Sequence, residues 1–373
     1  MSSRSTGKPS LVTGILPPFP LYQRDMSVRV ENYAFQTPKT ASRAEGGSSN
    51  MDDLWMTAKR YTKGESSKNK KGLTLLFTHC NGAFKEEWEI VIELLFRLNE
   101  TAGEAFQIRE AWTFDRQNHG DAAVLNSRVL GSRPGGVSLY EWSAALVAFV
   151  RSPHMEGHRM VVVGHSAGST AWALTTKEFP KRQIPYVAII AVESTIVNRA
   201  VFERDLEERM QHMDFVVNAT QTRRDRWSSP QEAFKYFSKR LPWSVWDPRS
   251  IQLLVDYGLQ SLPNHADGVT LKCPKEQEAI SYPDKEPHFE SDTQLGEISR
   301  SVPVHIIWGE RIEFIPDYIR DSLSDPVDGR AIASVTEVED AGHMVVQEKP
   351  DIFAKAMSDI LLRITPSPAS SKL

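Results

Sequence analysis

Cysteine is scarce in this sequence. Its 373 residues include two cysteines, Cys80 and Cys273, and no Cys-x-x-Cys pair. Two widely separated cysteines exclude a disulfide framework, and no cluster of cysteine and histidine has the spacing of a zinc motif. A reducing, intracellular setting fits this composition. We expect neither a bound metal nor a cofactor.

Long apolar runs and an excess of one charge are also missing. No stretch of about 18 uncharged apolar residues occurs, so no membrane span is expected. The first twenty residues contain no sustained apolar segment, so a secretory signal is not expected either. The 44 Lys and Arg nearly balance the 48 Asp and Glu, leaving a formal net charge of −4. Without a basic excess, nucleic acid is not an expected partner.

Both ends of the sequence differ in composition from the middle. We expect residues 1–25, rich in proline and serine, to form a loose arm, and residues 365–373 to form a tail. The last three residues, Ser371, Lys372 and Leu373, form a tripeptide that a soluble receptor reads as an address for the peroxisome. The sequence therefore predicts binding to the peroxisomal import receptor and localisation in the peroxisomal matrix.

Short continuous apolar runs alternate with helical patterns through most of the chain. Runs such as Leu73–Thr78, Met160–Val163 and Val187–Val192 are typical of strands that are buried on both faces. The alternation predicts an α/β fold whose mostly parallel central sheet is covered by helices on both faces. Residues 26–196 would form the first part of this core and residues 301–364 the second.

Between residues 197 and 300 the alternation stops. Polar helical patterns in this segment predict a separate helical insertion that lies over the sheet as a lid. Most of its large apolar residues are expected to pack a small core of their own, and some to line an acyl pocket. These residues are Phe234, Tyr236, Phe237, Trp243, Trp246, Leu253, Leu254 and Tyr257.

The strongest local pattern is Gly-His-Ser-Ala-Gly at residues 164–168. An apolar strand pattern leads into this G-x-S-x-G segment and a helical pattern follows it, which is the context of a nucleophile elbow. The turn is so tight that the residues two positions from the serine must lack side chains. Ser166 is therefore the expected nucleophile of an α/β-hydrolase fold.

A serine nucleophile needs a base and an oxyanion hole. His343 follows the last predicted strand and precedes the last predicted helix, which is where α/β-hydrolases carry their base. The loop after the first buried strand reads His-Cys-Asn-Gly-Ala-Phe from residue 79, and we expect the N–H of Ala83 to join that of Ala167 in receiving the oxyanion. Cys80 in this loop is expected to be a small buried filler.

The acid that orients the histidine has two candidate positions. Many α/β-hydrolases carry an aspartate three residues after the glycine that ends the strand before the last, but Ile312 occupies that place. Glu313 is one residue away. Glu193, at the end of the strand that follows the nucleophile helix, is the favoured alternative, and both stay open on sequence grounds.

Several of these segments together resemble a known family, the fungal α/β-hydrolases encoded in host-selective toxin gene clusters, with the related peroxisomal lipase-like hydrolases. The matching segments are residues 78–86, 117–121, 164–168 and 342–343, with the terminal Ser-Lys-Leu. This resemblance implies an acidic residue after the strand that follows the elbow helix, which supports Glu193. It also implies peroxisomal work on acyl intermediates, such as the assembly of a toxin side chain.

The expected activity is serine-dependent hydrolysis of an ester or thioester, with a small acyl compound as substrate. Two alternatives stay open. The same Ser-His site would also serve an acyltransferase if the lid excluded water. A member of the fold without activity would instead bind a hydrophobic ligand or partner, and the absence of the late aspartate favours that alternative.

Overall fold

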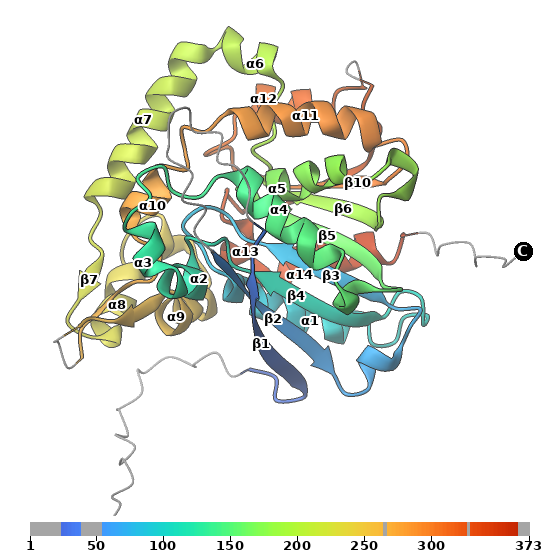
Figure 1. Cartoon of the computed structure of the whole chain (residues 1–373), viewed down its shortest axis with the longest axis horizontal. Helices are drawn as coiled ribbons and strands as arrows, with labels where there is room; N and C mark the ends of the chain where they lie inside the picture. The colour runs from blue at the N-terminus through green and yellow to red at the C-terminus, as the bar shows by residue number, and fades with distance from the viewer. Residues whose placement is uncertain (1–23, 39–53, 264–266, 327–328, 365–373) are drawn as a thin grey trace, which may run out of the picture.

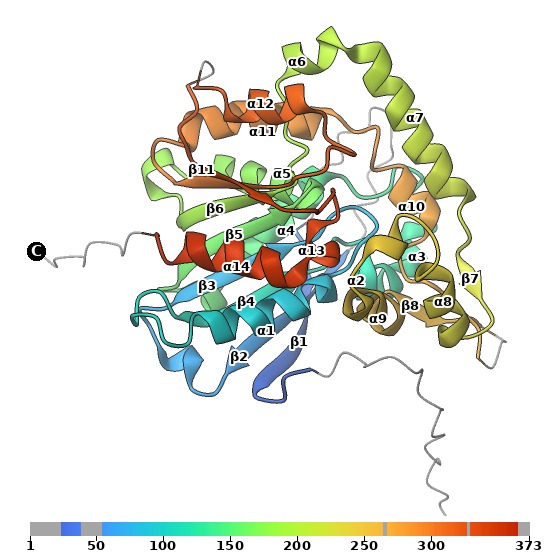
Figure 2. The same ribbon diagram turned by 180° about the vertical axis from the view of Figure 1, so that it is seen from behind.

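An eight-stranded sheet forms the centre of the protein. The structure is a computed structural model that describes residues 24–38, 54–263, 267–326 and 329–364. The strand order is β1-β2-β4-β3-β5-β6-β10-β11 (Figures 1 and 2). β2 is antiparallel to both of its neighbours, and the other strands are parallel. The strands are β1 (Val28–Gln36), β2 (Trp55–Lys63), β3 (Leu73–Thr78), β4 (Ile108–Phe114), β5 (Arg159–His165), β6 (Tyr186–Val192), β10 (Val304–Gly309) and β11 (Ile332–Val338).

Helices cover both faces of this sheet, as the buried strand patterns predict. On the face seen in Figure 1 lie α4 (Leu139–Val150), α5 (Ala167–Thr175) and α11 (Glu286–Ile298). On the opposite face, seen in Figure 2, α1 (Glu89–Leu98) lies beside α14 (Pro350–Leu361). The predicted α/β-hydrolase architecture is confirmed.

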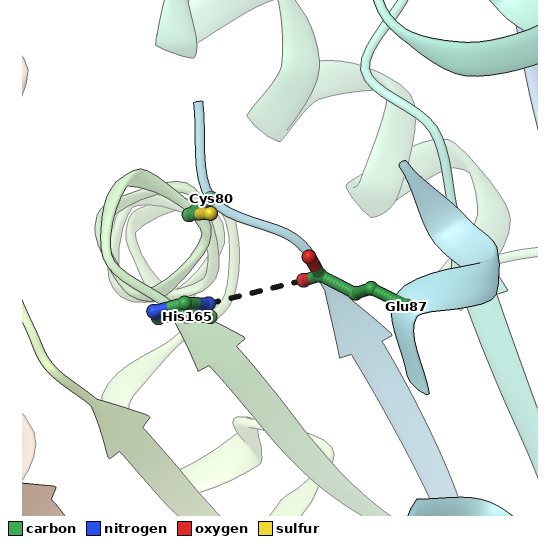
Figure 3. Close-up of side chains that lie close together, drawn as sticks. All are labelled: Cys80, Glu87 and His165. Carbon is green, nitrogen blue, oxygen red and sulfur yellow. Dashed lines mark ion pairs between the residues drawn. The ribbon is translucent and has the colours of Figure 1, made fainter. Parts of the chain in front are cut away.

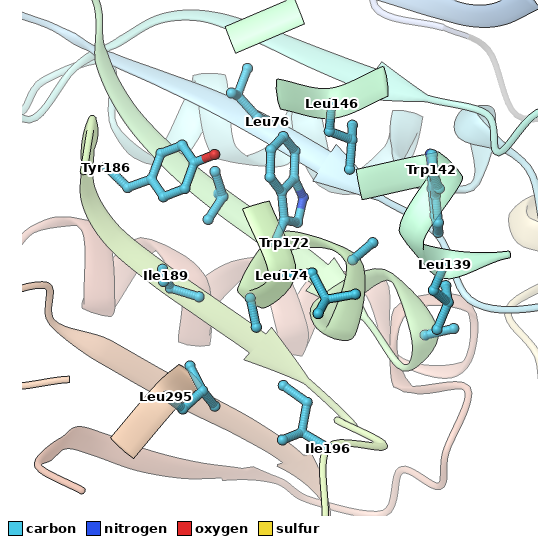
Figure 4. Close-up of a cluster of buried hydrophobic side chains, with 14 of the residues drawn as sticks. Leu76, Leu139, Trp142, Leu146, Trp172, Leu174, Tyr186, Ile189, Ile196 and Leu295 are labelled. Atoms are coloured by element: carbon cyan, nitrogen blue, oxygen red, sulfur yellow. The ribbon is translucent and has the colours of Figure 1, made fainter. Parts of the chain in front are cut away.

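The larger of the two cores that flank the sheet is rich in aromatic side chains. Trp142 on α4 and Trp172 on α5 are almost fully buried and pack against aliphatic residues of the strands. Figure 4 shows Trp172 surrounded by side chains of several elements, with Leu76 on β3 and Tyr186 on β6 among them. This packing fixes α5, and with it the nucleophile elbow at its start.

The insertion between β6 and β10 departs from the expectation in two ways. It is not wholly helical, because β7 (Arg226–Trp227), β8 (Leu259–Ser261) and β9 (Val269–Leu271) form a three-stranded sheet. In addition, its last helix, α11, belongs to the core, since Leu295 and Ile298 are buried in the larger core of the sheet. The remaining helices of the insertion are α6 (Arg199–Arg204), α7 (Leu206–Thr222), α8 (Pro230–Phe237), α9 (Pro248–Tyr257) and α10 (Lys275–Ala279).

The insertion has a hydrophobic core of its own. Trp227, Phe237 and Leu253 are buried in it, and Phe84 and Ile90 from the sheet domain complete it. The insertion therefore packs on the segment that follows β3, and most of its aromatic residues form a core, as expected from the sequence. Figure 1 shows α7 as a long helix along one side of the molecule, with α8, α9 and β7 at its far end.

Short helices complete the described chain. They are α2 (Gly120–Leu125), α3 (Ser127–Leu130), α12 (Asp317–Ser324) and α13 (Val345–Glu348), with 3-10 turns at Ser66–Lys68, Lys85–Trp88, Pro153–Met155, Thr176–Glu178, Lys181–Gln183 and Trp243–Val245. None of the helices in the described ranges is long and apolar enough to cross a membrane. The predicted arm lies almost entirely outside the described residues, and the predicted tail with its terminal tripeptide lies wholly outside them.

Candidate active site

Ser166 stands at a strained turn between β5 and α5. Its φ of 53° and ψ of −118° lie in a backbone region that residues other than glycine rarely adopt. Its N–H donates to the carbonyl of Val192 at 2.8 Å, which ties the turn to the neighbouring strand. A Cβ at Gly164 would lie 2.3 Å from the backbone nitrogen of Ser169, and one at Gly168 would lie 2.7 Å from the carbonyl oxygen of Thr78. Both glycines of the motif are therefore required by close backbone contacts.

His343 lies in the loop between β11 and α13 and contacts Glu193. Nδ1 of His343 lies 3.0 Å from Oε2 of Glu193, and the carboxylate is fully buried. Because a carboxylate accepts hydrogen bonds, Nδ1 carries the proton and the lone pair is left on Nε2. Burial lowers the pKa of His343, and the negative charge of Glu193 opposes part of this shift. The ring is therefore neutral and suited to accept a proton.

The second oxygen of Glu193 is also fixed. Oε1 accepts from the N–H of Gly309 at 2.6 Å and from Nη2 of Arg320 at 3.2 Å. Arg320, on α12, is buried and also donates to the carbonyls of Gly309 and Ile315, at 2.6 and 3.2 Å. The sequence alone did not identify Arg320, because an arginine in a polar amphipathic helix has no pattern that marks a buried contact.

Glu313, the alternative acid, contacts the same loop differently. Its Oε2 accepts from the backbone N–H of His343 at 3.4 Å, and its Oε1 accepts from Nε of Arg311 at 3.0 Å. Its side chain is 46% exposed. The carboxylate thus lies against the backbone of the histidine loop and bonds neither ring nitrogen of His343.

The two expected oxyanion donors differ in their availability. Ala167 is the first residue of α5, so its N–H has no acceptor within the helix. The N–H of Ala83, in contrast, already donates to the carbonyl of Cys80 at 3.3 Å. Among the described residues nothing accepts from the N–H of Asn81, which lines the cavities at Ser166. The structure therefore favours Asn81 over Ala83 as the second donor.

Histidines and the insertion hold the loop that carries Asn81. The Nδ1–H of His79 donates to the carbonyl of Cys80 at 2.7 Å, and burial lowers the pKa of His79 to about 3, so this ring is neutral. The N–H of Gly82 donates to Nε2 of His119 at 3.0 Å. Gly82 has a φ of +78°, and a Cβ there would lie 2.6 Å from the carboxylate of Glu278 in the insertion. The loop is thus held from the core and from the insertion.

Two cavities meet at Ser166. The larger, of about 870 Å³, is lined by Ser166, His343 and residues of the insertion such as Trp243. The smaller, of about 110 Å³, is lined by Ser166 and by apolar side chains that include Phe202 and Phe289. Both cavities therefore offer space for parts of a substrate next to Ser166.

Comparison with known proteins agrees with this geometry. The sequence profile described as the alpha/beta hydrolase family matches residues 75–356, which is most of the chain. The chain belongs to the alpha/beta hydrolase family. No curated protein matches it in a sequence search.

Solved structures of other alpha/beta hydrolases share the fold at low sequence identity. The peroxisomal alpha-beta-hydrolase Lpx1 from Saccharomyces cerevisiae superimposes with a TM-score of 0.72 at 17% identity, over 94% of this chain and 93% of that one. The thioesterase domain from the curacin biosynthetic pathway superimposes with a TM-score of 0.58 at 12% identity, over 90% of this chain and 99% of that one. The Mycobacterium tuberculosis esterase Rv0045c superimposes with a TM-score of 0.56 at 17% identity, over 89% of this chain and 92% of that one.

A buried ion cluster supports the segment that follows the Asn81 loop. Nζ of Lys85 lies 2.8 Å from the carboxylate of Asp115 and 2.6 Å from that of Asp121. Asp115 also accepts from the N–H of Lys85 at 2.8 Å and from the hydroxyl of Thr57 at 2.7 Å. Burial would lower the pKa of Lys85, but the facing carboxylates outweigh it and raise the pKa. This cluster anchors the turn after β3 to β2 and to the end of β4.

Proposed function

We propose that this alpha/beta hydrolase is a serine-dependent enzyme that cleaves a carboxylic ester or thioester. The observation that carries this proposal is the contact of 3.0 Å between Nδ1 of His343 and a buried oxygen of Glu193, next to a cavity that Ser166 and His343 both line. A serine, a histidine and an orienting carboxylate are the groups that acyl transfer to a serine requires.

In this mechanism Ser166 attacks the substrate carbonyl while Nε2 of His343 takes its proton. Glu193 holds the Nδ1–H tautomer and stabilises the imidazolium that forms. The N–H groups of Ala167 and Asn81 receive the negative charge that develops on the carbonyl oxygen. The imidazolium then gives its proton to the leaving alcohol or thiol.

Water resolves the acyl-enzyme in the second half of the reaction. Nε2 of His343 takes a proton from the water, which attacks the ester of Ser166, and the serine regains its proton as the acid leaves. The apolar side chains in part of the smaller cavity, such as Phe202 and Phe289, suit the acyl group, and the larger cavity suits the leaving group. The insertion acts as a lid over this site.

Covalent labelling tests the proposal directly. A fluorophosphonate probe should label the wild-type protein at one site, and Ser166→Ala should abolish labelling while the folded state persists. Esters and acyl-CoA thioesters of increasing chain length should then be turned over by wild type and not by the variant. A wild-type protein that neither reacts with the probe nor turns over any of these substrates would instead be a binding protein of the same fold.

The proposal extends to the site of action. The terminal Ser371, Lys372 and Leu373 support import into the peroxisomal matrix, and the likeness in fold to a peroxisomal hydrolase is compatible with it. The resemblance to hydrolases of fungal toxin clusters supports work on acyl intermediates of a secondary metabolite. A fluorescent protein fused before residue 1 should enter peroxisomes, and deletion of the last three residues should leave it in the cytosol.

A further inference from the structure

Three buried side chains with metal-ligating atoms lie directly behind the nucleophile. Cys80 follows β3, Glu87 lies in the 3-10 turn at Lys85–Trp88, and His165 is the last residue of β5. Figure 3 shows them approaching one another from these three segments. One donor atom of each, a thiol, a carboxylate oxygen and an imidazole nitrogen, lies within 4.8 Å of the others, and all three residues are buried.

Two of these donor atoms have no partner at hydrogen-bond distance among the residues that the structure describes. Nδ1 of His165 and Oε1 of Glu87 are both buried without one, and they face each other at 3.8 Å (Figure 3). A buried polar atom without a partner costs free energy, so two of them aimed at one point indicate a group that satisfies both. A cation between them and the thiol of Cys80 would do so.

The opposite ends of the same side chains are held by hydrogen bonds. Nε2 of His165 lies 2.8 Å from the carbonyl oxygen of His343 and therefore carries a proton, which leaves the lone pair on Nδ1. Oε2 of Glu87 accepts from Nε2 of Gln347 at 2.6 Å. Histidines that bind metals characteristically donate their other N–H to a carbonyl or carboxylate, and ligating carboxylates are themselves hydrogen-bonded. The cluster has both features.

We propose that Cys80, Glu87 and His165 form a binding site for one divalent cation of the zinc type. Thiolate and imidazole ligands disfavour Mg²⁺ and Ca²⁺, which prefer oxygen, and three protein ligands with an open fourth position are typical of Zn²⁺. Ligand atoms in a tetrahedral zinc site lie about 3.5 Å apart, so small side-chain rotations would bring the three donor atoms, now within 4.8 Å of one another, to that spacing. Binding exchanges the proton of the Cys80 thiol for the metal, and that proton leaves to solvent.

The site is reachable and is connected to the catalytic groups. Cys80 and Glu87 line the same large cavity as Ser166, which gives the cation a path of entry. Cys80 precedes Asn81, His165 precedes Ser166, and His165 also bonds the backbone of His343. The cation would therefore fix the oxyanion loop, the elbow and the histidine loop relative to one another. Residues 80, 87 and 165 do not have the sequence spacing of a known zinc motif, so the sequence alone does not indicate this cluster.

Metal binding by the full-length protein tests the proposal. After treatment with a chelator, the chain should take up one Zn²⁺ in competition with a chromophoric chelator, and Mg²⁺ should not compete. Cys80→Ser and Glu87→Gln should each weaken binding by about 100-fold or more, and Gln347→Leu by about tenfold. Cys273→Ser, at the other buried cysteine, is the matched control and should bind as wild type does. Ser166→Ala should also bind, whatever its activity.

Spectroscopy gives a second measurement that does not depend on a stable Cys80 variant. Co²⁺ bound to the wild-type chain and to Cys273→Ser should show a thiolate-to-metal charge-transfer band, because Cys80 is then the thiolate ligand. The proposal is overturned if no stoichiometric Zn²⁺ binds, if Cys80→Ser binds as tightly as wild type, or if the Co²⁺ band is absent. Any of these results would mean that His165 and Glu87 form an ion pair without a metal.

Discussion

Glu193 and His343 are 150 positions apart in the sequence, yet Oε2 of the first lies 3.0 Å from Nδ1 of the second. The contact joins the end of β6 to the loop after β11, across the intervening strand β10. Glu193 has a positive φ of 45°, a conformation that an ordinary residue adopts only when its surroundings enforce it. We take this as the mark of a carboxylate held for a function, and it leads to the first prediction.

Glu193→Gln should lower kcat by about 10³- to 10⁴-fold, because the amide cannot stabilise the imidazolium and also favours the wrong tautomer of His343. Steady-state kinetics on an ester substrate measures the effect. Glu313→Gln is the matched control, since its carboxylate contacts the backbone of the same loop, and it should change kcat by less than about tenfold. Equal losses in both variants would contradict the assignment of Glu193 as the triad acid.

The pH dependence of kcat/KM should reflect the burial of His343. The ring must be neutral to accept the proton of Ser166, so activity is present above its pKa and lost as pH falls through it. Burial lowers this pKa below 6.5, and Glu193 opposes part of the shift. The acid limb of the wild-type profile should therefore lie below pH 6.5, and in Glu193→Gln it should move lower still. Circular dichroism over the same range separates titration from unfolding, and an acid limb above pH 6.5 would refute the prediction.

The parts of the fold and site that depend on local patterns were predictable from the sequence. The apolar runs predicted β3, β5 and β6 to within a few residues. The glycines at 164 and 168 marked Ser166 because the G-x-S-x-G pattern between a strand and a helix is local in the sequence, although the atoms that exclude a Cβ at Gly168 belong to the distant Thr78 and His79. The order of the segments likewise singled out His343, whose ring contacts Glu193 in the structure.

Features that depend on contacts between distant segments were not predictable. The sequence favoured Glu193 over Glu313 but left both open, because one residue of difference in a loop decides whether a carboxylate meets the ring or the backbone of His343. The hydrogen bond from the N–H of Ala83 to the carbonyl of Cys80 could not be foreseen either, since the turn that uses this N–H forms only in the folded loop. The apolar residues of α11 resemble those of the insertion in sequence, and only packing on α5 assigns them to the core.

Arg320 should act as a positioning residue for Glu193. Arg320→Met removes the donor to Oε1 and the bonds to three backbone carbonyls, so the carboxylate loses its fixed direction. We expect kcat per active site to fall by about 10- to 100-fold with little change in KM. The fraction of active sites is measured by titration with the fluorophosphonate probe, which separates slow turnover from loss of folded protein.

Arg330→Met provides the control for this effect. Arg330 is also a buried arginine, and it pairs with Asp292, away from Glu193. Its loss should reduce the free energy of unfolding but leave kcat per labelled site near the wild-type value. Arg320→Lys should recover only part of the loss, because a single ammonium cannot replace several guanidinium donors. If both methionine variants lowered kcat per site alike, Arg320 would have only a general structural role.

The buried ion cluster at Lys85 should dominate the stability of the segment next to the oxyanion loop. Lys85→Met leaves the fully buried carboxylate of Asp115 without its cation, and we expect the free energy of unfolding to fall by about 3–5 kcal/mol. Denaturant titration followed by fluorescence measures this change. Lys71→Met is the matched control, since Lys71 pairs with Glu104 on the surface at 2.9 Å and should give no measurable change. Similar stability of Lys85→Met and wild type would show that Asp115 is satisfied by Thr57 and the backbone alone.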